Sequence, residues 1–310
     1  MGINIRNDFI MSLIESHIGE FAALLTAFFW TITSLSFESA GNKVGSLAVN
    51  VLRLLMGFLF LSIFTFFKRG MVLPLDASAH NWIWLTLSGL VGFVFGDLLL
   101  FKAYTVIGSR FSMLIMTLVP PLTTFFGWII IGERLKLIQF AGMALTFSGI
   151  AMAIFNRNGK GEKLSLKLDR KGIFLAMGGA IGQALGMVLS KLGLGDYDPF
   201  SATQIRIIAG IVGFTILTTI LGRWKNILNA TRNRSGMSAI TLGAFFGPFL
   251  GVSFSLIAVK YTEAGIAATI MALVPVLIIP PAVLLQKEKV TYPEIIGAII
   301  SVAGVAVFFL

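Results

Sequence analysis

Hydrophobic residues along this chain gather in long runs that short polar segments separate. The runs approach the roughly 20 residues that a helix needs to cross the hydrocarbon core of a bilayer. Short segments of alternating polarity, which are typical of an outer-membrane barrel, are absent from the sequence. The pattern predicts ten transmembrane helices, at residues 19–38, 47–67, 82–103, 111–131, 137–155, 172–192, 202–221, 237–259, 264–285 and 292–309.

The two halves of the chain repeat each other. The sequence IMTLVP at residues 115–120 returns 155 residues later as IMALVP at residues 270–275. The first two spans match the sixth and seventh at 153 residues, which aligns Arg53 with Arg206. Four glycines also recur at the longer offset: Gly92, Gly96, Gly142 and Gly149 match Gly247, Gly251, Gly297 and Gly304. A duplication in so apolar a chain indicates a transporter, because two membrane repeats can move about a central site.

The longest hydrophilic stretch lies between the fifth and sixth spans, where the two repeats meet. We therefore expect residues 1–155 to form the first five-helix repeat, 156–171 a basic connecting loop, and 172–310 the second five-helix repeat. Five is an odd number, so the second repeat should cross the membrane upside down relative to the first. The predicted fold class is an all-α membrane protein with ten transmembrane helices in two inverted five-helix repeats. This symmetry places a central site near the bilayer midplane.

Composition supports a membrane protein. Hydrophobic residues make up 56% of the chain and charged residues 12%, which is too little polar surface to cover a soluble globule. The net charge of +10 lies mostly in short loops, where it orients a protein against anionic lipid, so we expect membrane lipid and no nucleic acid as partner. Without cysteine, the chain has no disulfides or thiolate metal sites. No catalytic motif is found, and we predict no enzyme, no cofactor and no metal.

A motif occurs once in each repeat. Leu118-Val119-Pro120 precedes Glu133, and Leu273-Val274-Pro275 precedes Glu288 at the same spacing. With the aromatic residues Phe28-Phe29-Trp30, this pattern resembles the EamA-type drug/metabolite transporter superfamily over essentially the whole chain. The resemblance implies secondary transport of small metabolites, often export of amino acids or related compounds, through a central cavity. It also implies cytoplasmic termini, whereas the Lys and Arg excess favours outward termini, and both orientations stay open.

Three charged residues lie inside predicted spans. An arginine at mid-depth costs about 2.5–3.5 kcal/mol to insert, so Arg53 and Arg206 need an explanation. Either they face the cavity and attract a substrate carboxylate, or each is bound to a carboxylate or to helix-end carbonyls and locks two helices. Asp97 lies in the third span and matches Val252. It either couples proton movement to transport or pairs with Arg53 or Lys102.

Polar and aromatic residues complete the predicted cavity. Trp30 and Gln183 occupy matched positions, and Asn50 and Gln204 lie near the ends of their spans. A cavity for an amphipathic metabolite needs an aromatic wall with a few hydrogen-bonding groups. The alternative is that these groups only bridge neighbouring helices.

Prolines recur inside the fourth and ninth spans. Pro120 and Pro275 should bend their helices, either for gating or as fixed shape. Glu133 should stabilise the N-terminus of the helix that follows it, through the helix dipole.

These observations predict an exporter or permease of small polar metabolites such as amino acids, working by alternating access. We expect a monomer or homodimer in the inner (plasma) membrane. Two alternatives stay open. One is a membrane binding or assembly protein that transports nothing. The other is a lipid-linked carrier flippase, which requires a lateral opening to lipid.

Overall fold

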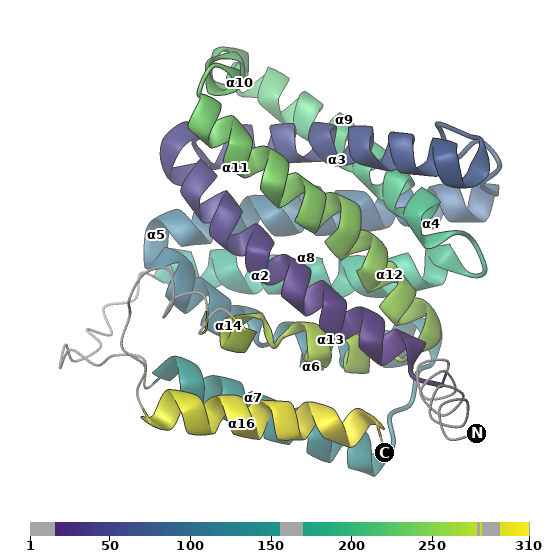
Figure 1. The fold of residues 1–310 in the computed structure, drawn as a ribbon, viewed down its shortest axis with the longest axis vertical. Coiled ribbons are helices and arrows are strands. Elements are labelled where there is room, and N and C mark those ends of the chain that lie inside the picture. Colours follow the sequence, from purple (N-terminus) through teal and green to yellow (C-terminus); the bar gives the residue numbers. More distant parts are fainter. Residues whose placement is uncertain (1–15, 156–169, 278–279, 281–291, 310) are drawn as a thin grey trace, which may run out of the picture.

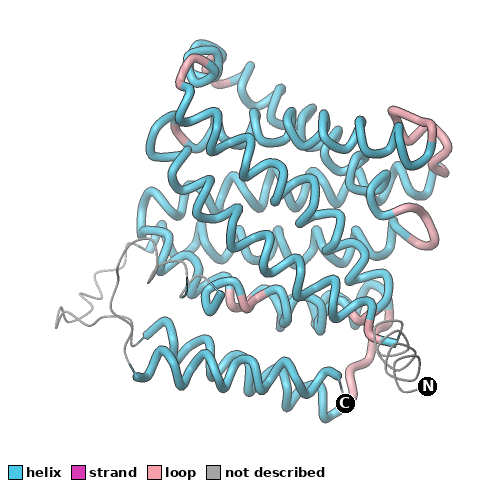
Figure 2. Tube along the Cα trace, in the orientation of Figure 1, coloured by secondary structure: helices cyan, strands magenta, loops and turns pink. Residues whose placement is uncertain are grey.

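The computed structural model describes residues 16–155, 170–277, 280 and 292–309. These residues contain helices and no strand (Figure 2). The α-helices are α2 (Ile18–Val44), α3 (Ser46–Arg69), α4 (Ala79–Gly89), α5 (Asp97–Met116), α6 (Val119–Ile131), α7 (Leu137–Phe155), α8 (Arg170–Leu194), α9 (Pro199–Ile220), α10 (Trp224–Thr231), α11 (Arg234–Ala244), α12 (Val252–Tyr261), α13 (Ala264–Met271), α14 (Val274–Leu277) and α16 (Tyr292–Ala306). Two π-helices, η1 (Leu90–Gly96) and η2 (Phe245–Gly251), and the 3₁₀ helix η3 (Val307–Phe309) complete the described elements.

In the part of the chain that the structure describes, six helical segments are long and apolar enough to cross a membrane. They are Ile18–Val44, Ser46–Arg69, Ala79–Ala103, Arg170–Leu194, Pro199–Ile220 and Arg234–Tyr261. These segments coincide with the first, second, third, sixth, seventh and eighth predicted spans. The remaining predicted spans fall on shorter apolar helices, and the ninth continues beyond the described residues. The all-helical fold class is therefore confirmed, and the count of ten stays a prediction.

The sequence repeat reappears in the helix boundaries. The π-helix η1 begins at Leu90, and η2 begins 155 residues later at Phe245. The helices on either side follow the same rule: α4 and α5 begin at Ala79 and Asp97, and α11 and α12 begin at Arg234 and Val252. Start signals recur as well, because Ser78 caps α4 and Asn233 caps α11, each accepting a backbone hydrogen bond three residues on. The two repeats thus share their local backbone plan.

The two repeats pack into each other. The segment formed by α4, η1 and α5 lies against α8, and the segment formed by α11, η2 and α12 lies against α2. Figure 1 shows α2 and α8 running in opposite directions across the molecule. Glycines allow this close approach: a Cβ on Gly182 of α8 would lie 2.7 Å from the Cα of Gly96. Each repeat therefore completes the other.

The two π-helices occupy the middle of this packing. In each one the following residue bonds back five positions, from the N–H of Asp97 to the carbonyl of Gly92 and from that of Val252 to Gly247. Such wide turns are rare and occur often at functional sites. The wide turn of η1 directly precedes Asp97.

The two repeats differ in the segment that follows the π-helix. In the second repeat, α12 ends at Tyr261 and α13 begins at Ala264, with Thr262 and Glu263 in extended conformation. In the first repeat, α5 runs unbroken from Asp97 to Met116. We expected a connection between residues 103 and 111, and the structure has helix there instead.

In each repeat the helix breaks where the Leu-Val-Pro motif begins. In the first repeat α5 ends at Met116 and α6 resumes at Val119, so Pro120 lies in the first helical turn. There its missing N–H removes no hydrogen bond. In the second repeat α13 ends at Met271, and Pro275 follows the start of α14. The prolines thus begin new helices after a break.

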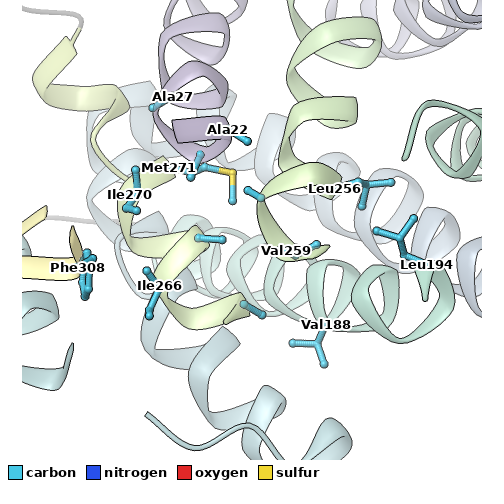
Figure 3. Close-up of a cluster of buried hydrophobic side chains, with 14 of the residues drawn as sticks. Ala22, Ala27, Val188, Leu194, Leu256, Val259, Ile266, Ile270, Met271 and Phe308 are labelled. Carbon is cyan, nitrogen blue, oxygen red and sulfur yellow. The ribbon is translucent and has the colours of Figure 1, made fainter. Parts of the chain in front are cut away.

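Apolar side chains divide between an interior and an outer surface. Figure 3 shows part of one buried cluster, in which Ala22 of α2, Val188 of α8, Leu256 of α12 and Ile266 of α13 gather. A second cluster is centred on Leu54 and Phe214. On the outside, large apolar residues stay exposed, among them Phe67, Leu137, Phe174 and Ile220. That surface suits contact with lipid tails.

Candidate functional site

A charged network lies in the interior between the two repeats. The guanidinium of Arg53 on α3 forms an ion pair with Oδ2 of Asp97, the first residue of α5. Gln183 on α8 donates from Nε2 to Oδ1 of the same carboxylate at 2.5 Å. Gln183 lies near the middle of the Arg170–Leu194 helix, so the network meets α8 far from either end of that helix. Of the two cations that the sequence offered to Asp97, the structure pairs it with Arg53.

Burial makes this network energetically sensitive. Arg53 is 7% exposed and Asp97 is 6% exposed. Removing two charges from water costs several kcal/mol for each ion, which only good pairing and further hydrogen bonds repay. Aromatic rings add to the pairing, because the Arg53 guanidinium lies 5.6 Å from the ring centre of Phe37 and 5.3 Å from that of Phe101. Each oxygen of the Asp97 carboxylate thus has one partner.

Arg206 lies beside this network without joining it. Its guanidinium carbon lies 4.8 Å from the ring centre of Phe93 in η1, a contact worth about 2 kcal/mol when desolvated. Its charge attracts Asp97, but among the described residues no hydrogen bond or ion pair reaches the Arg206 side chain. Arg206 is 6% exposed. Among the described residues, the interior therefore holds two buried cations and one buried anion.

Trp30 on α2 occupies the position in the first repeat that matches Gln183 in the second. A Cβ on Gly251 of η2 would lie 2.7 Å from Cδ1 and Nε1 of Trp30, which places the indole against this π-helix. Gly96 of η1 lies in the same way against the backbone of Gln183. Trp30 packs on the buried cluster that Figure 3 shows in part. The structure thus places Trp30 against η2, whereas Gln183 lies against η1.

Asn50 and Gln204 lie outside the charged network. Gln204 donates to Oγ of Ser62 at 2.9 Å and to the carbonyl of Val72 at 2.7 Å. These bonds tie α9 to α3 and to the loop after α3. Asn50 is buried on α3, and its Oδ1 has no hydrogen-bond partner.

Polar contacts also join the repeats at the end of the molecule where α3 ends and α9 begins. Lys68 pairs with Asp198 at 2.6 Å, and the Asp198 side chain accepts from the N–H of Ser201. Burial acts to raise the pKa of the Asp198 carboxyl, but the hydrogen bonds from Lys68 and Ser201 outweigh it. The pKa therefore lies below its ordinary value of 3.8.

Glu133 belongs to the same end but does not act on its own following helix. Its carboxylate accepts from the N–H of Ala264, the first residue of α13, at 2.9 Å, and pairs with Lys191 at 2.5 Å. The expected stabilisation of a helix N-terminus is therefore found on a helix of the other repeat. A surface groove of about 580 Å³ adjoins this contact, lined by Ile131, Glu133, Arg134, Lys191, Leu192, Lys260, Tyr261, Thr262 and Glu263.

Sequence reasoning missed the residues that shape the site around Asp97. Phe93 lies under Arg206, and Gly89 lies against the Arg206 backbone, where a Cβ would come within 2.4 Å of its carbonyl oxygen. The spacing of Gly89, Gly92 and Gly96 on one segment was the available signal for close packing. Nothing in that spacing indicates a π-helix.

Comparisons with known proteins agree with this two-fold plan. A model of the EamA-like transporter family matches residues 17–155 and again residues 170–310. Solute carrier family 35 member G1 of Homo sapiens is 25% identical over 215 residues, which are 67% of this chain and 57% of the human protein. The chain thus matches little more than half the length of that relative. An uncharacterized transporter of Clostridium kluyveri is 23% identical over 283 residues, covering 91% of this chain and 89% of the bacterial protein.

A solved crystal structure has the same fold. It superposes with a TM-score of 0.72 over 95% of this chain and 96% of the solved chain. The sequence identity is 18%, so this likeness concerns the fold alone.

Proposed function

Because the chain belongs to the EamA-like transporter family, we propose that it is a secondary-active transporter of small polar metabolites such as amino acids. It works as an exporter or permease in the inner (plasma) membrane, by alternating access. The six candidate spans and the family match make it a multi-pass membrane protein. Ten spans in two inverted repeats, divided at residues 156–171, complete the proposed architecture.

One observation carries the proposal: a buried polar network joins the two repeats near the middle of α8. Arg53 and Asp97 come from the first repeat, whereas Gln183 comes from the second. A purely structural interior has little use for such a network, because apolar side chains of similar size are often equally stabilising. Ionisable groups inside a membrane domain often mark substrate or ion pathways.

The network also offers a way to couple binding to movement. The hydrogen bond from Gln183 to Asp97 crosses between the repeats, so a relative shift of α8 and α5 changes it. A polar substrate that supplies replacement hydrogen bonds stabilises the shifted arrangement. Differential stabilisation of two arrangements is what alternating access requires.

Transport by purified protein in proteoliposomes tests this function. We expect counterflow of radiolabelled metabolites from an amino acid library, and we expect Arg53→Ala and Asp97→Asn to abolish it. Thr218→Ala is the matched control, because Thr218 on α9 is buried and its hydroxyl has no hydrogen-bond partner. If both network variants keep full flux while their thermal stability falls, the charges only lock helices, and the non-transporting alternative is favoured.

A specific surface feature supports the flippase alternative. A groove of about 560 Å³ lies between α3 and α11, lined by Phe60, Met237, Ser238, Thr241, Leu242 and Phe245. Its mostly apolar lining suits an acyl chain. Transbilayer movement of a fluorescent lipid in vesicles tests this reading. If the flippase alternative holds, Ser238→Trp should block lipid movement. If the main proposal holds, Ser238→Trp should leave counterflow of soluble metabolites intact.

A further inference from the structure

The buried charges of the interior do not balance. Two guanidinium groups, on Arg53 and Arg206, share one carboxylate, on Asp97. Arg53 pairs with Oδ2 of Asp97, and Gln183 donates to Oδ1. Both carboxylate oxygens therefore have a partner, and the described site keeps one net positive charge.

Arg206 carries that surplus. The residue is 6% exposed, and its Nε has no hydrogen-bond partner. Its guanidinium contacts the face of the Phe93 ring, which attracts the charge but accepts none of its N–H bonds. Buried donors in proteins are normally satisfied, and each exception needs an explanation.

The pseudosymmetry shows what Arg206 lacks. Arg53 and Arg206 occupy matched positions on α3 and α9, but Asp97 is matched by Val252. At the matched position, the carboxylate that pairs with Arg53 thus has no counterpart for Arg206. A carboxylate from outside the chain supplies the same chemistry, with the bidentate geometry that a guanidinium prefers.

We infer that Arg206 binds the carboxylate of a monoanionic substrate. This inference rests on the proposed function and narrows it. A single negative charge neutralises the surplus, whereas a dianion such as a phosphate monoester reverses it. An amino acid is then recognised through its carboxylate.

Three compounds with the same apolar body test the assignment: an α-amino acid, the acid without the amine, and the amine without the carboxylate. Binding is measured by thermal shift in detergent and transport by counterflow. We expect the two carboxylates to bind and the amine to be inactive. Arg206→Gln should weaken carboxylate binding at least about tenfold, and Arg206→Lys should recover part of the loss. Thr218→Ala on the same helix should leave binding unchanged.

The outcomes separate this inference from the proposed function. Carboxylate binding that depends on Arg206, with no counterflow of any compound, upholds the anion site and overturns transport. Counterflow that is equal for the amine and the acid, or unchanged in Arg206→Gln, overturns the anion site and leaves transport standing. If Arg206→Gln fails to fold, Arg206→Lys decides, because the retained charge should keep the preference for carboxylates with reduced affinity.

Discussion

The two π-helices have similar backbone packing, but the side chains around them differ. At η1, Gly96 lies against Gln183, and Asp97 follows with its partner Arg53. At η2, Gly251 lies against Trp30, and Val252 follows inside an apolar cluster. Close approach is thus a property of the duplicated backbone, whereas the buried carboxylate belongs to one copy only. In the function that we propose, the substrate therefore binds off the symmetry axis, toward η1.

Breaking the ion pair between Arg53 and Asp97 should have the largest effect on stability. Arg53→Ala leaves Asp97 buried without its ion-pair partner, and loss of one member of such a pair costs about 3–5 kcal/mol. Thermal unfolding in detergent measures the loss. The double variant Arg53→Met with Asp97→Leu should recover most of the stability, since neither charge remains. An Arg53→Ala protein as stable as the wild type would contradict the observed pairing.

Removing the contact between the repeats should have a smaller effect. Gln183→Leu deletes the hydrogen bond to Oδ1 of Asp97 and leaves a buried acceptor without a donor, which costs about 1–3 kcal/mol. The apolar copy provides the comparison, because Trp30→Leu at the matched position leaves no charged group unpaired. A larger loss of carboxylate binding in Trp30→Leu than in Gln183→Leu would reverse our assignment of chemistry to the two copies.

Giving the second repeat the carboxylate that the first repeat has at Asp97 should affect substrate binding more than protein stability. Val252→Asp supplies Arg206 with the carboxylate that Arg53 already has. We expect substrate carboxylates to bind at least about tenfold more weakly, or about 1.4 kcal/mol, with the melting temperature kept. Val252→Asn is the uncharged control. If Val252→Asp melts far below Val252→Asn, the new carboxylate is unpaired, and position 252 does not face Arg206.

Substitution at the end of the molecule where α9 begins should have the smallest effect on stability. Asp198→Ala removes the cap of α9 and the pair with Lys68, a loss of about 1 kcal/mol. Because the pKa of Asp198 is lowered by folding, its contribution is complete above 3.8 and disappears as the pH falls through the folded-state value. Melting curves of both proteins should therefore converge on acidification. A constant difference down to low pH would contradict the charge-based account. The matched residue in the first repeat is Gly45, so the asymmetry extends to this end.

Sequence predicted the repeated backbone well. The offsets of 155 and 153 residues predict where most matched helices begin, because each copy carries its own capping and glycine signals. The family resemblance is also confirmed. The sequence could not decide which residues from different helices pair. Asp97 lies five residues before Lys102 on one helix, yet it pairs with Arg53 on another. Likewise, Glu133 acts on α13, which only the packing of the repeats brings near.

The interleaving of the repeats has a consequence for how the chain is made. Arg53 and Asp97 both belong to the first half, so they can neutralise each other in the bilayer before α8 is synthesised. Gln183 reaches the carboxylate only when α8 inserts, and Arg206 enters with α9 after that. The order of residues along the chain is thus also an order of charge neutralisation during synthesis. Arg206 inserts last, after the Asp97 carboxylate of the network has paired with Arg53 and Gln183.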